Sequence, residues 1–423
     1  MFQVSGQEKN PKLGFYTVGE EIFYSKPAAL IHATKTGHYP TWHFNTEIYA
    51  KLSWDRDPEI NLKELYRLRA QQLRDQYDYI RLEASGGSDS TTVIYSFLLN
   101  NINLDEIVYR YPAQLDTGVT NDPFNTKAEN TLSERQFAAD PLLNWVKTNY
   151  PRTKVTFQDY GETLLTSNYM KDESWITHTR EYLQPGHGIK YSHFNTREHK
   201  LLADSGKKIC SLHGVDKPRM ALLENNWYGF FGDVQANSPC PVRGDHDNII
   251  SELFYWTPDF PEISIKQAHM IATWFDMPQN SHLKYLLQWP NRGFARRTAV
   301  EQLMKSIIYP DYDHETWQTS KPTNNFYNEM DHWFHVNLKD TAVYRTWQAG
   351  VQYLIDKIDS KYLTYEYNKP TGFVGFVTPL YFLKASTVDN NQPAFVNQSY
   401  KQETGATGEI LAVVNKKLKK IQF

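Results

Sequence analysis

The chain of 423 residues is long enough for two or three domains, and its formal net charge of −3 gives no overall positive charge that would indicate a nucleic-acid partner. Charged residues make up 22% of the sequence and aromatic residues 14%, with a mean hydropathy of −0.62, which is typical of a soluble protein. The start has no signal-peptide pattern, no stretch approaches 18 apolar residues, and two cysteines make no disulfide framework, so we expect a cytoplasmic protein with no membrane partner.

Residues 1–75 are predicted to form a short α+β segment. Residues 15–24 form two apolar runs around Gly19, which predicts a pair of short strands in a hairpin. Residues 27–36 are expected to form a short helix, and the spacing of leucines over 62–77 predicts a second helix.

Residues 76–240 are predicted to form an α/β domain, because strand-like and helical patterns alternate there. The expected strands are 80–83, 106–110, 154–157 and 208–212, and the expected helices are 90–100, 142–150 and 197–204. Repeated β-then-α order favours a parallel sheet with helices on both faces and ligands at the carboxyl ends of the strands.

The loop Ser85–Ser90 lies at such a carboxyl end, directly after the first strand. Its consecutive glycines, Gly86 and Gly87, let backbone N–H groups converge on an anion, and the helix that follows adds unpaired donors and partial positive charge. Asp89 would repel a phosphate unless a cation such as Mg²⁺ lay between them. Gly-Gly with Ser and Asp is also common in turns and helix N-caps, so a simple turn stays an alternative.

This loop resembles the SGGxDS pyrophosphate loop of the N-type ATP pyrophosphatases, which include asparagine synthetase, GMP synthetase, NAD synthetase and 7-cyano-7-deazaguanine synthase. The matching residues are Ser85, Gly86, Gly87, Ser88, Asp89 and Ser90. Enzymes of this superfamily split ATP between the α and β phosphates, adenylate a substrate oxygen, and let an amine or another nucleophile displace AMP.

The resemblance implies an adenine nucleotide alpha hydrolase-like fold with ATP and Mg²⁺ as cofactors. It implies that Ala84 and the loop hold the phosphates, that Asp89 binds the metal, and that the adenine lies beside 108–111, Tyr109 included. Asparagine synthetase also has a glutaminase domain whose nucleophile is the cysteine after the initiator Met. Here Phe2 occupies that position and the first segment is too short, so we expect nitrogen from ammonia, a substrate amine or a partner.

Two basic residues, Lys217 and Arg219, follow the fourth predicted strand in a turn that contains Gly214 and Pro218. Their position at a strand end suits neutralisation of departing pyrophosphate, and a charged surface turn is the alternative. The resemblance supports Lys217 more than Arg219, since the superfamily places basic residues near the phosphates from this side.

Two further stretches are rich in aromatic residues. Residues 161–194 contain His178, His187 and His193 but no His-x-x-x-His pair, which favours a substrate-facing loop over a metal site. Residues 226–233 are predicted to form an aromatic hairpin or strand pair appended to the sheet, with its rings packed in the core; stacking on a base or a planar substrate is the alternative.

Residues 241–423 are predicted to form a mainly helical region, with helices over 263–275, 282–288 and 295–309. Four basic residues make this region locally positive, namely Arg292, Arg296, Arg297 and Lys305. They form either a solvated helix face or a contact with an anionic substrate or a nucleic acid. The lysine-rich tail has no functional interpretation beyond solubility or docking.

The leading hypothesis is therefore an AMP-forming ligase similar to asparagine synthetase, in which Asp89, Lys217 and Arg219 serve catalysis. The acceptor is a small molecule or a nucleobase. Modification of a nucleobase or tRNA by an enzyme of the same superfamily is the second hypothesis, although the net charge does not indicate a nucleic acid. A non-catalytic nucleotide-binding protein is the third hypothesis. The sequence leaves the oligomeric state open, a homo-oligomer included.

Overall fold

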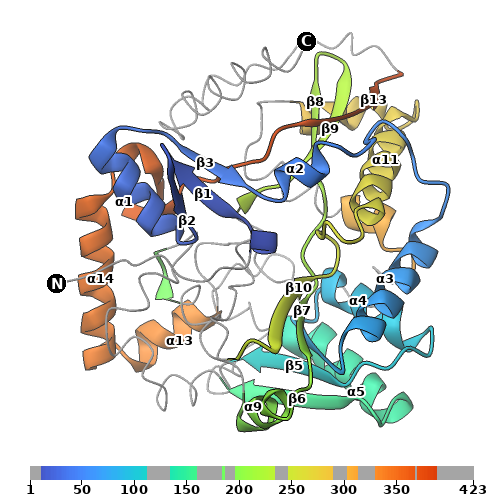
Figure 1. Cartoon of the computed structure of the whole chain (residues 1–423), viewed down its shortest axis with the longest axis horizontal. Coiled ribbons are helices and arrows are strands. Elements are labelled where there is room, and N and C mark those ends of the chain that lie inside the picture. Colours follow the sequence, from blue (N-terminus) through green and yellow to red (C-terminus); the bar gives the residue numbers. More distant parts are fainter. Residues whose placement is uncertain are drawn as a thin grey trace.

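Figure 1 shows the computed structural model of the chain. The structure describes residues 11–111, 134–159, 183–185, 196–233, 246–288, 303–312, 329–366 and 369–387. Several residues singled out in the sequence lie outside these ranges: His178, His187, His193, Cys240, Arg292, Arg296, Arg297 and the lysine-rich tail.

The largest sheet in the described residues, called the central sheet below, is a five-stranded parallel sheet with the strand order β10-β7-β4-β5-β6. Its strands are β4 Tyr79–Ala84, β5 Glu106–Tyr111, β6 Lys154–Asp159, β7 Ile209–His213 and β10 Ile249–Leu253. The predicted α/β class and the parallel sheet are confirmed. Because β5 and β6 extend the sheet on one side of β4, and β7 and β10 on the other, the order reverses between β4 and β7, where α/β sheets bind ligands.

The edge strand β10 was not predicted. It lies beyond residue 240, where the α/β domain was expected to end, so the central sheet extends into the region predicted to be mainly helical. Within the described ranges, that region contains the strands β10, β11 (Leu363–Glu366), β12 (Lys369–Phe373) and β13 (Tyr381–Ala385) in addition to its helices. The sequence analysis missed these strands, which are short and lie among segments with helical periodicity.

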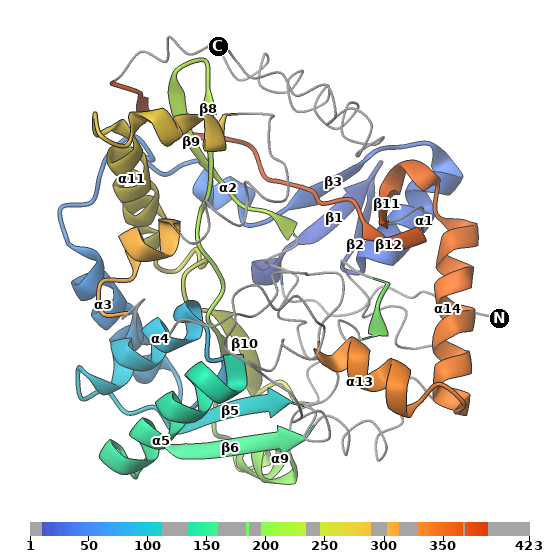
Figure 2. The same ribbon diagram turned by 180° about the vertical axis from the view of Figure 1, so that it is seen from behind.

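Helices cover both faces of the central sheet (Figure 2). The helices α3 (Leu62–Gln76), α4 (Ser88–Leu98) and α5 (Asp140–Asn149) share one apolar core with Ile80 and Cys210 of the strands. On the opposite face, α9 (Arg197–Asp204) packs Ala203 against Ile209 and Ile249. Alternate residues of each strand point to opposite faces, which accounts for this division.

The main helices begin and end where local chemistry predicts. The Asn61 side chain accepts a hydrogen bond from the Glu64 N–H at 3.0 Å and caps α3. The helix α1 (Lys26–Thr36) ends at Gly37, whose φ is 74°. The helix α11 (Glu262–Asp276) agrees with the helix predicted over 263–275. Within the described ranges, no helix has both the length and the apolar character required to span a membrane.

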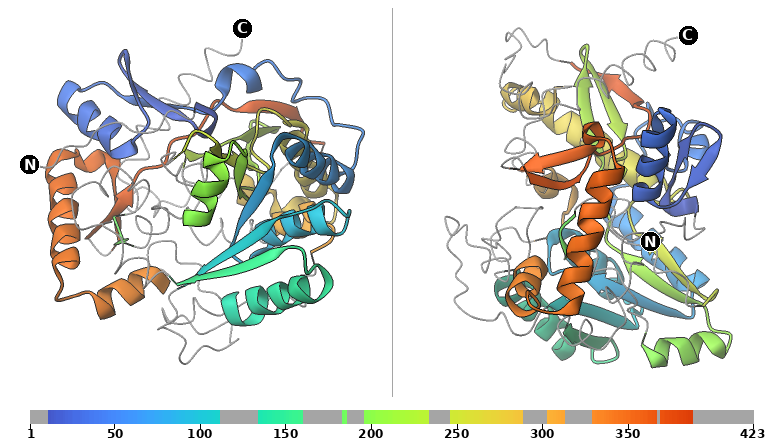
Figure 3. Two further views of the ribbon diagram at one scale, coloured as in Figure 1. Left: turned by 60° about the horizontal axis from the view of Figure 1, so that its bottom comes forward. Right: turned by 90° about the vertical axis from the view of Figure 1, so that its left-hand side faces the viewer.

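The N-terminal strands pack against the C-terminal part of the chain. The antiparallel sheet β2-β1-β3 comprises β1 Phe15–Val18, β2 Glu21–Phe23 and β3 Pro40–His43. Figure 3 shows α14 (Ala342–Lys357) beside α1, near α13 (Glu329–Asn337). The Asp359 N–H donates to Thr34 Oγ1 at 2.9 Å and links these two ends of the chain.

The aromatic stretch 226–233 is not appended to the central sheet, so that prediction is wrong. Its strand β9 (Asn226–Phe230) turns back on β8 (Arg219–Leu223) and pairs on its other side with β13, forming a separate antiparallel sheet. Glu224 and Asn225 form the two-residue turn with positive φ values of 49° and 59°, as in tight hairpins. The predicted core packing of its rings is confirmed, because Trp227 and Phe231 are fully buried.

A buried ion pair joins these parts of the molecule. Lys26 Nζ lies 2.8 Å from Asp233 Oδ2, and both side chains are fully buried. Asp233 also accepts hydrogen bonds from the Tyr16 hydroxyl and the Phe376 N–H, each at 2.8 Å. One carboxylate thus connects α1, β1 and the segments that follow β9 and β12.

Replacement of Lys26 by Met should destabilise the protein by about 3–5 kcal/mol, because it leaves the Asp233 carboxylate buried without its cation. The matched control is Lys63→Met, which removes an exposed ion pair with Asp311 at 2.9 Å and should cost at most about 1 kcal/mol. Thermal unfolding followed by circular dichroism measures both. Equal shifts in the unfolding midpoint would show that the buried ion pair stabilises the protein no more than the exposed one.

Candidate phosphate-binding site

The loop Ser85–Gly87 connects β4 to α4 at the point where the strand order of the sheet reverses. Gly86 has a φ of 80°, and a Cβ atom added there would lie 2.6 Å from Ala139 Cβ. A Cβ atom added at Gly87 would lie 2.9 Å from Glu134 Oε1. Gly86 is therefore required by both its backbone conformation and its contact with Ala139, whereas the end of the flexible Glu134 side chain could move away from a Cβ atom at Gly87.

The serines of the loop have different roles. Ser90 Oγ accepts from the Ser85 N–H at 3.3 Å and donates to the Gly87 carbonyl at 3.1 Å, while Ser85 Oγ accepts from the Gly87 N–H at 3.3 Å. These bonds fix the shape of the loop itself. Ser88 Oγ is buried in the first turn of α4 and has no hydrogen-bond partner among the described residues. A buried hydroxyl without a partner at a helix N-terminus suits an anionic ligand.

Asp89 is held by contacts from two distant parts of the chain. Lys217 Nζ lies 3.0 Å from its Oδ1 and 3.2 Å from its Oδ2, and the Tyr309 hydroxyl donates to Oδ1. Burial acts to raise the pKa of Asp89, but Lys217, Lys305 and the Tyr309 hydrogen bond outweigh it and hold that pKa below its ordinary value. Asp89 is therefore ionised at neutral pH.

The structure brings Lys217 into contact with Asp89 of the loop, and Arg219 into contact with Asp216. Lys217 is buried, and its ammonium also lies 2.6 Å from Asp216 Oδ1. Arg219 Nη2 lies 3.6 Å from the other oxygen of Asp216, so this carboxylate links the two basic side chains. The connection after β7 passes close to α4, because a Cβ atom at Gly214 would lie 3.2 Å from the Asp89 carbonyl.

The region predicted to lie beside the adenine is an aromatic cluster at the ends of β5 and β6. Ala84 pairs with Tyr109 across the sheet, and the buried Tyr109 ring lies 6.0 Å from that of Tyr111. The Arg135 guanidinium lies 3.7 Å from the centre of the Tyr111 ring, and Phe157 is 38% exposed beside it. These planar groups provide surfaces on which another planar ring can stack.

Residues that sequence reasoning did not assign to the site contact Asp89. The Tyr255 hydroxyl donates to the Asp89 carbonyl at 2.8 Å, and Tyr309 contacts the Asp89 carboxylate as described. Burial raises the pKa of both tyrosines well above its ordinary value, so both remain protonated donors. Tyr255 lies two residues after β10, a strand that was not predicted, and Tyr309 is the last residue of the helix predicted over 295–309, so neither position indicated a role in the site.

A layer of charged groups lies behind the loop, on the face of the sheet covered by α9. Glu83 forms ion pairs with Arg110 and, at 3.0 Å, with Arg81. Burial acts to raise the pKa of Glu83, but these two guanidinium groups lower it below the ordinary value. His199 of α9 joins the same layer, with Nε2 2.6 Å from Glu106 and Nδ1 3.0 Å from Arg81. The strand that ends at the loop is thus tied to its neighbours by buried charges.

No family model and no curated protein sequence matches this chain.

Within the described residues, no group of three His, Cys, Asp or Glu side chains forms a metal site. Asp89 and Asp216 are two carboxylates that meet at Lys217 Nζ. This set fits Mg²⁺ bound by one or two carboxylates together with substrate phosphates, which is how Mg²⁺ commonly binds in proteins.

The substitution Gly86→Ala should distort the loop, because it combines a positive φ with overlap against Ala139. We expect a lower unfolding midpoint and a loss of at least about tenfold in ATP affinity measured by isothermal titration calorimetry. Gly37→Ala is the matched control, since Gly37 has a similar φ of 74° but no atom within 4 Å of the added Cβ. ATP affinity unchanged in Gly86→Ala would exclude this loop as the nucleotide site.

Proposed function

We propose that this chain is an ATP-dependent adenylating enzyme that cleaves ATP to AMP and pyrophosphate and so activates a substrate oxygen for attack by an amine or ammonia. The observation that carries the proposal is the position of the Ser85–Ser90 loop at the reversal point of the sheet, with the buried Ser88 hydroxyl left without a described partner. The strand order also supports an adenine nucleotide alpha hydrolase-like fold.

The contacts of the loop suggest how the phosphates are held. Backbone N–H groups of the loop and of the first turn of α4 would bind phosphate oxygens, and the Ser88 hydroxyl would donate one further hydrogen bond. Arg135 and Tyr111 lie at the end of β5, where the adenine ring would stack. Gly86 and Gly87 would allow the phosphates to approach the backbone closely.

Charge rearrangement at Asp89 would assist the departure of pyrophosphate. In the structure Lys217 is shared by Asp89 and Asp216. Mg²⁺ held by Asp89 would neutralise the phosphate charge. Lys217, released from Asp89, would then turn its ammonium towards the β phosphate and stabilise the negative charge that develops when the bond from the α phosphorus to the bridging oxygen breaks.

The acceptor oxygen forms the new bond to the α phosphorus in this reaction, and the nucleophile that later displaces AMP also belongs to the substrates. The protein therefore needs no covalent nucleophile of its own. It contributes by holding the two reactants in line and by stabilising charge, and both effects account for much of the rate enhancement in many enzymes. The single cysteine in the described ranges, Cys210, is buried, and burial raises the pKa of its thiol well above the ordinary value.

The test is an assay with α-labelled ATP, Mg²⁺ and a fractionated pool of metabolites and tRNA, in which AMP is resolved from ADP. We expect AMP from the unaltered protein and a loss of about 10²–10³-fold in its rate of formation in Asp89→Asn. Asp311→Asn, which alters the exposed ion pair with Lys63, is the control and should retain the full rate.

The products separate the hypotheses. AMP that depends on the tRNA fraction would assign the protein to nucleic-acid modification, and AMP that depends on small metabolites would assign it to ligase chemistry. Formation of ADP alone would contradict the proposal. Binding of ATP without any nucleotide product would favour the non-catalytic role.

A further inference from the structure

Tyr309 contacts Asp89 from a part of the chain far from the loop. It is separated from Asp89 by 220 residues in sequence, and its side chain is buried. Its hydroxyl donates to Oδ1 of Asp89, which also accepts from Lys217 at 3.0 Å. Among the described residues, Oδ2 has one polar contact, with Lys217 at 3.2 Å. The two oxygens of this carboxylate are therefore not equivalent.

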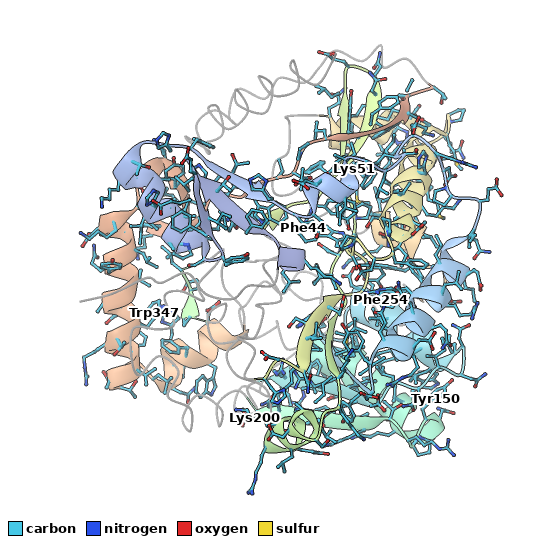
Figure 4. The ribbon with its side chains drawn as sticks, viewed as in Figure 1. Phe44, Lys51, Tyr150, Lys200, Phe254 and Trp347 are labelled. Atoms are coloured by element: carbon cyan, nitrogen blue, oxygen red, sulfur yellow. The ribbon has the colours of Figure 1, made fainter. Side chains whose placement is uncertain are left out.

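The position of the Tyr309 ring is fixed by packing. The Tyr66 hydroxyl of α3 donates to the Ile308 carbonyl at 2.8 Å and accepts from Gln267 of α11 at the same distance. The Tyr255 ring lies 5.7 Å from the Tyr309 ring. Figure 4 labels Phe254, whose ring lies 5.0 Å from that of Tyr255 at the end of β10. The hydroxyl is thus presented from a rigid aromatic cluster.

We propose that Tyr309 is a positioning residue that orients the Asp89 carboxylate so that Oδ2 is presented to the divalent cation of a bound nucleotide. This inference rests on the proposed function, because it names a determinant of the cation site within the same loop. It is carried by the unequal contacts of the two Asp89 oxygens and by the buried, fixed ring of the donor.

Lys217 cannot set this orientation by itself. Its ammonium is a compact charge on a flexible stem and lies at nearly equal distances from the two oxygens of Asp89. A tyrosine hydroxyl held by a packed ring donates in one direction. Mg²⁺ requires near-ideal octahedral geometry, so the orientation of its carboxylate ligand affects how readily it binds. Because the donor to Oδ1 is fixed in place, the orientation of the Asp89 carboxylate, and with it the direction of Oδ2, is fixed as well.

The experiment measures the Mg²⁺ dependence of thermal stabilisation by α,β-methylene-ATP, which cannot be cleaved at the α–β linkage. At a fixed concentration of this analogue, MgCl₂ is titrated and the unfolding midpoint is recorded by scanning fluorimetry. Tyr309→Phe should raise the MgCl₂ concentration for half-maximal stabilisation by about tenfold, because it removes a hydrogen bond to a charged group. Stabilisation at saturating MgCl₂ should be retained.

The control is Tyr66→Phe, which removes the hydrogen bonds of the Tyr66 hydroxyl with Ile308 and Gln267 but no contact with Asp89. It should leave the MgCl₂ midpoint within about twofold of the original value, because hydrogen bonds to neutral groups contribute less. Equal shifts in both variants would show that Tyr309 acts only through packing and would overturn the inference. An unchanged midpoint in Tyr309→Phe would also overturn it.

A double-mutant cycle tests whether Tyr309 affects the MgCl₂ dependence through Asp89. The cycle remains informative if Tyr309→Phe also lowers the unfolding midpoint without ligand. In the Asp89→Asn background, Tyr309→Phe should have no further effect on the MgCl₂ dependence, since the carboxylate is already absent. A full additional shift would contradict positioning through Asp89.

Failure of the proposed function would give a different result: the unaltered protein would show no stabilisation by the analogue at any MgCl₂ concentration.

Discussion

The contact between Asp89 and Lys217 is the interaction on which the candidate site depends. It joins the first turn of α4 to the connection after β7. The strand before α4 is β4, and β4 and β7 are neighbours at the point where the strand order of the sheet reverses. Because Lys217 is buried, its charge requires close carboxylate partners, and Asp89 and Asp216 supply them. The same connection passes close to the α4 backbone at Gly214. The pair therefore links the loop to the β7 connection through opposite charges.

The second constraint is that the C-terminal part of the chain completes the loop. Tyr255 and Tyr309 bind the carbonyl and the carboxylate of one residue, Asp89, and both hydroxyl groups are delivered from a buried cluster. The Lys26–Asp233 pair in turn connects the N-terminal strands to the segments after β9 and β12. The parallel sheet is therefore not an independent unit, since the first and last described segments share one apolar core with it.

The sequence predicted the part of the fold that local patterns determine. The strands β4 to β7 and the helices α3, α4 and α11 agree with the expected ranges to within about two residues, because their apolar periodicity and capping residues are local. The loop was recognisable because glycines at 86 and 87 follow a strand. The strand β10 was missed because five residues after a Pro- and Gly-rich stretch carry little pattern. Tyr309 was missed because its contact with Asp89 spans 220 residues, a distance over which no local pattern carries information.

The charged layer on the α9 face explains why β4 alternates polar and apolar residues although it lies at the centre of a parallel sheet. Strands buried on both faces are usually apolar throughout, but here Arg81 and Glu83 point to one face and Ile80 and Leu82 to the other. A buried ion pair contributes little net stability relative to apolar residues, since desolvation offsets most of the attraction. Its directional contacts do fix the lateral position of neighbouring strands. Because Glu83 lies two residues before the loop and is paired with Arg110 of β5, this layer sets where the loop begins relative to the aromatic cluster at the end of β5.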